Sequence, residues 1–159
     1  MQILEIYYSR SGNTEKLAEA IVSGIDRVEG VNYLLKPAAE VTNDDILNSR
    51  GIIAGSPVYY GTMAAELKAV FEKSVTIRQQ MGDMVGAAFA TGGGASGGKE
   101  TTLISIIQAM LISGMIIVGD PLDATGHYGV ACLGSPDNQA EIDAKKLGQR
   151  VAELVKKLG

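Results

Sequence analysis

The sequence predicts an α/β domain in which a parallel sheet carries helices on both faces. Three observations support this prediction. Short β-rich segments alternate five times with segments of helical periodicity along the 159 residues. The β-rich segments are continuously apolar, as strands buried on both faces are. Glycine residues and hydroxyl side chains are concentrated directly after several of these segments, where the loops of such a sheet bind ligands.

The first half of the chain supplies three strands and three helices. The strands are expected where β-rich apolar runs occur, at residues 3–8, 31–35 and 51–54. The helices are expected where apolar residues recur at helical spacing, at residues 14–27, 44–47 and 63–73. In the first of these helices Leu17, Ile21 and Ile25 share one face, which is typical of an amphipathic helix packed on a sheet.

The second half continues the alternation. Strands are expected at residues 84–90 and 115–118, and a short extra strand is possible within residues 128–133. Helices are expected at residues 100–112 and 139–158, the second with a clear apolar stripe. No linker, repeat or low-complexity tract interrupts the chain, so we expect one domain over residues 1–159.

Composition excludes several classes of protein. Hydrophobic residues make up 46% and charged residues 20%, which excludes a disordered chain. No apolar run approaches the ~20 residues of a membrane span. The first ten residues lack a basic region and are expected to form a strand, so we expect no signal peptide and a cytoplasmic location. The net charge of −4, without a basic patch, argues against nucleic-acid binding.

Cysteine content limits the covalent and metal chemistry. Cys132 is the single cysteine, which excludes a disulfide framework and a cysteine-based zinc site. We expect Cys132 to be a small buried hydrophobe, and we expect no metal site.

A loop rich in hydroxyl groups follows the first strand. It consists of Ser9, Arg10, Ser11, Gly12, Asn13 and Thr14 and precedes a helix. The free N–H groups and the dipole of a helix N-terminus favour an anion, and the hydroxyls add donors. An ordinary N-cap with turn residues is the alternative, but three hydroxyls and a glycine exceed what capping needs. The loop is therefore predicted to bind a phosphate.

Aromatic residues stand in the loop after the third strand. This loop contains Pro57, Val58, Tyr59, Tyr60 and Gly61 in a chain with only 5% aromatic residues. A flat ligand can stack on such side chains while their hydroxyls stay wet. The alternative, that both tyrosines simply cover the rim of the core, is about equally favoured by the sequence.

The loop after the fourth strand is glycine-rich. It contains Thr91, Gly92, Gly93, Gly94, Ala95, Ser96 and Gly97, followed by Gly98 and Lys99. A nucleotide P-loop would need Ser or Thr where this chain has Glu100, and a dinucleotide fingerprint belongs after the first strand of its unit. The remaining interpretation is a loop whose amides lie against a flat, hydrogen-bonding ligand.

With these loops, the chain resembles the flavodoxin superfamily, and within it the tryptophan-repressor-binding-protein (multimeric flavodoxin) branch of NAD(P)H:quinone oxidoreductases and NADPH-dependent FMN reductases. The resemblance is carried by residues 8–14, 55–65 and 90–94, and further by residues 114–118, 128–129 and 134–136. It implies a flavodoxin-like, doubly wound, five-stranded parallel sheet of order 2-1-3-4-5. The chain departs from the branch at Ser113, where a histidine is usual, and in having no tryptophan.

The resemblance also implies a cofactor, FMN, and roles for the loops. Residues 9–14 would hold its phosphate, residues 57–61 would line its ring, and residues 91–98 would face the pyrimidine edge of the ring. The implied activity is a two-electron reduction of quinones by NAD(P)H, in two half-reactions at one site. Flavin chemistry needs no catalytic side chain, although His127 and Tyr128 could assist.

Other functions remain open on the sequence. The main alternative is a flavodoxin-type electron carrier that serves a redox partner protein; such carriers are usually strongly acidic, and −4 is weak for that role. A non-redox protein that kept the fold is a third class. A receiver domain is excluded, because residues 9–11 are Ser-Arg-Ser where it needs paired acids. The sequence favours a solvated loop position for His127 over a role in the reaction.

Oligomerisation is suggested by one helix. Residues 101–112 are too apolar for a helix with a single buried face, so we expect another subunit to cover part of it in a dimer or tetramer.

Overall fold

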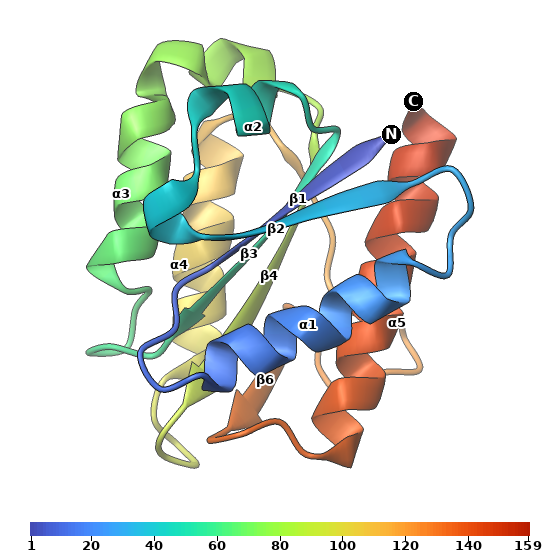
Figure 1. Cartoon of the computed structure of the whole chain (residues 1–159). Helices are drawn as coiled ribbons and strands as arrows, with labels where there is room; N and C mark the ends of the chain where they lie inside the picture. Colours follow the sequence, from blue (N-terminus) through green and yellow to red (C-terminus); the bar gives the residue numbers. More distant parts are fainter.

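A parallel sheet forms the middle of the computed structural model, which describes residues 1–159. Its strands follow the order β2-β1-β3-β4-β5, with β6 also paired to β4, and every pairing is parallel (Figure 1). The strands are β1 (Gln2–Tyr7), β2 (Asn32–Pro37), β3 (Gly51–Pro57), β4 (Val85–Gly92), β5 (Ile116–Ile117) and β6 (Val130–Leu133). The expected flavodoxin-like fold and strand order are confirmed.

Helices cover both faces of this sheet. They are α1 (Asn13–Ile25), α2 (Asn43–Leu47), α3 (Ala65–Lys73), α4 (Lys99–Ile112) and α5 (Asn138–Leu158), with 3₁₀ segments at Ala38–Glu40 and Ser74–Met81. Figure 1 shows α1 and α5 together on one face and α3 and α4 on the other. No helix combines the length and the apolar composition that crossing a membrane requires.

The fifth position of the sheet differs from the single strand expected at residues 115–118. β5 pairs only with Val85 and Gly86 of β4, and β6 pairs with Phe89–Gly92 further along the same strand. The two segments therefore form one interrupted edge of the sheet, separated by a loop over residues 118–129. The optional strand at residues 128–133 is confirmed as β6, shortened to four residues.

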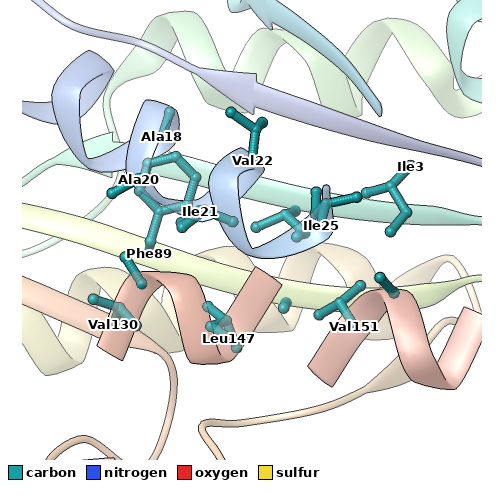
Figure 2. Close-up of a cluster of buried hydrophobic side chains, with 14 of the residues drawn as sticks. Ile3, Ala18, Ala20, Ile21, Val22, Ile25, Phe89, Val130, Leu147 and Val151 are labelled. Atoms are coloured by element: carbon teal, nitrogen blue, oxygen red, sulfur yellow. The ribbon is translucent and has the colours of Figure 1, made fainter. Parts of the chain in front are cut away.

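Two hydrophobic clusters lie on the two faces of the sheet. On the α1/α5 face, side chains of β1, β4, β6, α1 and α5 pack together, among them Phe89, Ile21 and Leu147 (Figure 2). On the other face, Leu4 and Ile52 pack against α3 and α4 through Leu67 and Ile106. All of these side chains are essentially inaccessible to water. This burial supplies the main driving force for folding.

A close helix contact fixes the α1/α5 face. A Cβ atom at Gly148 would lie 2.1 Å from the carbonyl oxygen of Ile21, and one at Gly24 would lie 1.9 Å from that of Lys145. Two glycines, one on each helix, therefore let the backbones meet directly. This contact fixes the C-terminal half of α1 against α5.

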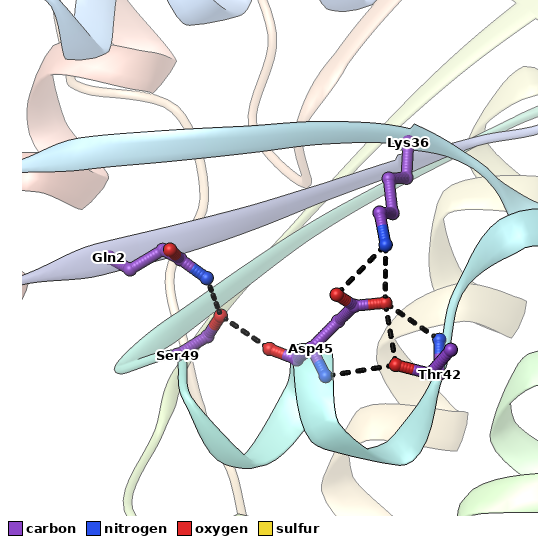
Figure 3. A network of polar contacts seen from close by, with 5 residues as sticks. All are labelled: Gln2, Lys36, Thr42, Asp45 and Ser49. Atoms are coloured by element: carbon purple, nitrogen blue, oxygen red, sulfur yellow. Dashed lines mark hydrogen bonds and ion pairs between the residues drawn. The ribbon is translucent and has the colours of Figure 1, made fainter.

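A polar network ties α2 to the sheet edge (Figure 3). Thr42 and Asp45 cap the helix reciprocally, and Lys36 of β2 forms an ion pair with Asp45 at 2.8 Å. Burial alone would raise the pKa of Asp45, but the hydrogen bonds from Lys36 and Thr42 outweigh it and lower the pKa. Ser49 continues the network by donating to the Asp45 carbonyl and accepting from the Gln2 amide.

Glu5 is an exception in the core. It lies on β1 with its side chain fully buried, and neither carboxylate oxygen has a hydrogen-bond partner. Because Ile3 packs in the α1/α5 cluster and side chains alternate along a strand, Glu5 faces that apolar cluster. Burial raises the pKa of Glu5 well above its ordinary value, because it disfavours the charged form of the carboxyl.

Replacing Glu5 is expected to stabilise the protein in a pH-dependent way. Glu5→Leu removes a buried unsatisfied carboxyl and should raise the free energy of unfolding by about 1–3 kcal/mol near neutral pH. The folded pKa lies above the unfolded one, so wild-type stability falls as pH rises from the unfolded pKa towards the folded one. The gain from Glu5→Leu should grow over this interval in urea unfolding. A gain that is the same at pH 4 and pH 8 would contradict the assignment, and exposed Glu29→Leu serves as the control.

Candidate functional site

The three loops predicted from the sequence meet in one cavity of about 480 Å³. It lies beyond the carboxyl ends of β1, β3 and β4, at the point where chain order reverses within the sheet. Its lining residues are Arg10, Ser11, Asn13, Thr14, Pro57, Val58, Tyr59, Thr91, Gly92, Gly93 and Gly134. The lining contains no Asp, Glu or His, and its one charged side chain is that of Arg10.

The first loop presents a helix N-terminus to this cavity. α1 begins after Gly12, whose φ of 87° belongs to the left-handed region that glycine adopts readily, and no side chain caps the helix. Ser9 does not line the cavity: its hydroxyl accepts the N–H of Gly12 at 3.1 Å and shapes the turn. The first-turn N–H groups of α1 are therefore left for a ligand that accepts hydrogen bonds.

A buried hydrogen bond connects the first and third loops. The hydroxyls of Thr14 and Thr91 lie 2.8 Å apart, and both residues are buried. Each hydroxyl has one proton and two acceptor positions, so only one of the two protons is used in this bond. The pair can therefore still donate one hydrogen bond into the cavity.

Glu15 carries the one negative charge in the first turn of α1. Its carboxylate accepts a hydrogen bond from the Tyr7 hydroxyl at 2.7 Å. Burial, and then the Glu15 carboxylate, raise the pKa of Tyr7 to about 12. Tyr7 therefore stays protonated and holds this carboxylate at the side of the anion-accepting turn. This pair was not predicted from the sequence, where its signal is the tyrosine at the end of the first strand.

The second loop is held rigidly at its base. Ser56 is fully buried; its hydroxyl donates to the Pro57 carbonyl at 2.7 Å and accepts the Ala64 N–H at 2.8 Å. The ring of Tyr59 packs edge-on against Tyr8, with centroids 6.3 Å apart. Pro57, Val58 and Tyr59 line the cavity. The contact of Tyr8 with Tyr59 was not predicted from the sequence.

Tyr60 and Gly61 lie at the tip of this loop instead of in the cavity lining. Tyr60 is fully exposed and has a φ of 51°, which is uncommon for a residue other than glycine. Backbone hydrogen bonds between Tyr59 and Thr62, each 3.1 Å, close the turn around the two residues. The side chain of Tyr60 is therefore displayed to solvent next to the cavity.

The third loop contributes only its first part to the cavity. Thr91 and Gly92 belong to β4, and Gly93 follows them into the lining. Gly94, Ala95, Ser96 and Gly97 are exposed and turn away, with the Gly97 N–H bonded to the Gly94 carbonyl. The Lys99 ammonium donates to the Ala95 carbonyl at 3.2 Å, which closes this turn.

Gly134 completes the cavity from the end of β6. Its N–H donates to the Gly92 carbonyl at 2.8 Å, and this hydrogen bond brings the last loop beside the third. Gly134 was not predicted as a site residue from the sequence, although Gly134-Ser135-Pro136 is a recognisable turn directly after an apolar segment.

His127 and Tyr128 lie elsewhere. Both line a second cavity, of about 370 Å³, at the outer edge of β6, and neither lines the first. Cys132 also borders the second cavity, and burial, followed by the charge of Asp137, raises its pKa to about 11. Its thiol is therefore unreactive at neutral pH, as expected for a buried hydrophobe. The chain has no group of three or more His, Cys, Asp or Glu residues that could hold a metal ion.

Comparisons with known proteins agree with this architecture. A model of the NADPH-dependent FMN reductase family matches residues 29–128. A flavodoxin of Aquifex aeolicus is 32% identical over 97% of this chain and 86% of its own length. An NAD(P)H dehydrogenase (quinone) of Archaeoglobus fulgidus is also 32% identical, over 99% of this chain and 98% of its own. The solved structure of an archaeal flavodoxin superposes with a TM-score of 0.83, at 28% identity over 98% of this chain and 99% of its own.

Fold and site together define a flavodoxin-like flavoprotein. The chain belongs to the NADPH-dependent FMN reductase family within the flavodoxin superfamily, and it binds FMN. The cavity suits this cofactor on structural grounds. It offers an uncapped helix N-terminus for a phosphate, a hydroxyl pair beside it and an aromatic wall for a flat ring. Its volume falls in the range of roughly 300–1,000 Å³ found for ligand pockets.

FMN is expected to bind more tightly than riboflavin, because only FMN brings an anion to the α1 N-terminus. Thr14→Ala should weaken FMN binding by about 1–3 kcal/mol through loss of a hydrogen bond to a charged group, and should affect riboflavin much less. Fluorescence titration of the apoprotein measures both affinities. Thr14→Ser keeps the hydroxyl and should stay close to wild type. Equal affinities for the two flavins would contradict a phosphate site at this turn.

Proposed function

We propose that FMN occupies the 480 Å³ cavity and that the protein uses it to reduce quinones with NAD(P)H, two electrons at a time. The observation that carries the proposal is the convergence of three chemically different loops on one cavity. The α1 N-terminus with Ser11, Asn13 and Thr14 would hold the phosphate. Pro57, Val58 and Tyr59 would form the wall against the ring.

The loop after β4 would act on the polar edge of the ring. The N–H of Gly93 donates to no backbone carbonyl of the chain, and the residue lines the cavity. Fixed amide dipoles at this position would favour negative charge as it develops, without reorganisation. We propose this role for residues 91–93; the exposed residues 94–97 serve to close the turn that holds Gly93 in place.

Bound FMN would supply the redox chemistry, by accepting a hydride from the nicotinamide and passing two electrons to the quinone. The protein residues would bind and orient. The cavity lining contains no carboxylate or imidazole that could act as acid or base, which supports a mechanism without a catalytic side chain. Because the chain forms one sheet and no separate nicotinamide-binding unit, nicotinamide and quinone would use the same open face of the flavin in turn.

Two relatives support different outcomes for the same site. The Archaeoglobus fulgidus relative named as an NAD(P)H dehydrogenase (quinone) supports the enzyme. The Aquifex aeolicus relative is named as a flavodoxin, which supports a carrier that receives electrons from, and gives them to, partner proteins. We favour the enzyme because the family model describes an NADPH-dependent reductase and because a net charge of −4 gives little steering towards basic partners.

Steady-state kinetics with NADH and benzoquinone test the alternating use of one face. FMN-loaded protein should give parallel lines in double-reciprocal plots, the ping-pong pattern. Intersecting lines would show that both substrates bind together and would overturn the scheme. If FMN-loaded protein oxidises neither NADH nor NADPH, the enzyme is excluded and the carrier function is favoured.

We also propose that the protein self-associates through the end of α4. Leu111, Ile112 and nearby Ile116 of β5 are 55%, 68% and 41% exposed, an unusual concentration of aliphatic surface. Sedimentation of FMN-loaded protein should show a dimer or tetramer, and the double variant Leu111→Gln, Ile112→Gln should shift it towards the monomer. Val75→Gln, at an exposed apolar position on another element, should not. A wild-type monomer at micromolar concentration would contradict the proposal.

A further inference from the structure

The second cavity lies along an unpaired edge of the sheet. β6 pairs with β4 on one side, and no strand pairs with its other side (Figure 1). The cavity of about 370 Å³ follows this open side. Its walls are the first turns of α4 and α5, through Lys99, Glu100 and Leu103 on one side and Asp137, Ala140 and Asp143 on the other.

Backbone groups of β6 point into this cavity. The Gly134 N–H donates to the Gly92 carbonyl of β4, and backbone groups of a parallel strand alternate in direction from residue to residue. Val130 and Cys132 therefore turn their N–H and C=O groups towards β4, and Ala131 and Leu133 turn theirs outwards. Both outward residues line the cavity.

The open edge has a defined beginning. Gly129 is the preceding outward residue, and its N–H is already taken by the Asp120 carboxylate at 3.0 Å. Asp120 is buried, so a protein group closes the edge at this point. The remaining donors and acceptors at Ala131 and Leu133 match two hydrogen-bonding positions of one short added strand.

Charge around the edge selects between occupants. The lining carries three carboxylates, of Glu100, Asp137 and Asp143, against the single ammonium of Lys99, which is turned to the Ala95 carbonyl. Glu100 and Asp137 are exposed on the two walls. Asp143 is buried and accepts hydrogen bonds from Thr125 and Gln139. Two copies of the chain paired through β6 would bring these carboxylates together. A basic segment would instead meet the excess of carboxylates in this lining, with an exposed one on each wall.

We propose that the outer edge of β6 binds an extended, lysine- or arginine-bearing segment of a partner protein as an additional strand. The backbone of Ala131 and Leu133 provides the hydrogen bonds. Leu103 and the half-exposed Leu133 contact the apolar side chains of the segment, and Glu100 and Asp137 attract its cations. Because β6 ends at Leu133 and the next residue, Gly134, lines the first cavity, a partner bound here lies directly beside the cofactor site.

A synthetic peptide provides the probe. Acetyl-Lys-Val-Lys-Val-Lys-amide is titrated into ¹⁵N-labelled, FMN-loaded protein. We expect the largest shifts at the amides of Ala131 and Leu133, and at least about tenfold slower hydrogen exchange there, because opening of a hydrogen-bonded amide limits its exchange. The same peptide with N-methylated valines should not bind, and acetyl-Glu-Val-Glu-Val-Glu-amide should bind at least about threefold more weakly. Shifts centred elsewhere, or equal binding of the N-methylated peptide, would overturn the proposal.

Variants at two positions separate the backbone and charge contributions. Leu133→Pro deletes an outward N–H that β4 does not use. It should weaken peptide binding at least about tenfold, because one hydrogen bond and the strand geometry around it are lost. Leu133→Val keeps the N–H and should bind like wild type. Asp137→Asn preserves the α5 cap, where the side chain accepts the Ala140 N–H, and should weaken binding about two- to fivefold at low salt only.

The controls keep these outcomes decisive. FMN affinity within about twofold of wild type shows that each variant is folded, because FMN binds only the assembled site. Equal peptide binding by Leu133→Pro and Leu133→Val would exclude the added strand. If the peptide does not bind and Leu133→Pro instead converts an oligomer to a monomer, β6 is an interface between copies of this chain and the proposal is wrong.

Discussion

The site depends on β4 more than on any other element. This strand pairs with β3 on one side and with β5 and β6 on the other, and it is buried along its whole length. Its last two residues, Thr91 and Gly92, belong to the cavity itself. Hydrogen bonds from Val58 and Gly134 to their carbonyl oxygens then bring the second and last loops to the same place.

The hydroxyl contact between Thr14 and Thr91 extends this constraint across the sheet. It joins the first turn of α1 to the end of β4, across 77 positions of sequence, inside a buried region. The direct backbone contact of α1 with α5 near Gly148 prevents α1 from sliding along the sheet. α1 is therefore held at both ends, by the hydroxyl contact at its first turn and by the backbone contact in its C-terminal half.

The interruption between β5 and β6 creates the second surface of the molecule. A continuous fifth strand would run past β4 without a break, but residues 118–129 leave the sheet and return at Val130. Two buried carboxylates organise this excursion: Asp120 accepts the Gly129 N–H, and Asp143 of α5 accepts hydrogen bonds from Thr125. Burial raises the pKa of Asp120, although the Gly129 N–H opposes this. His127 and Tyr128 lie in the excursion and face the second cavity, away from the residues of the cofactor site.

The sequence by itself determined the parallel α/β sheet and the positions along the chain of the three loops that meet in the first cavity. Apolar periodicity is local, and so are the turn residues after Tyr8, Gly55 and Ala90, so both can be recognised without contacts. Which loop residues enter the cavity was decided by tertiary structure, because hydrogen bonds between distant segments orient them. Tyr60 points to solvent since Tyr59 and Thr62 close the turn, residues 94–97 turn away since Lys99 closes theirs, and Gly134 enters because it bonds to Gly92. The unpaired edge of β6 has the same origin, because strand pairing is a property of the assembled sheet.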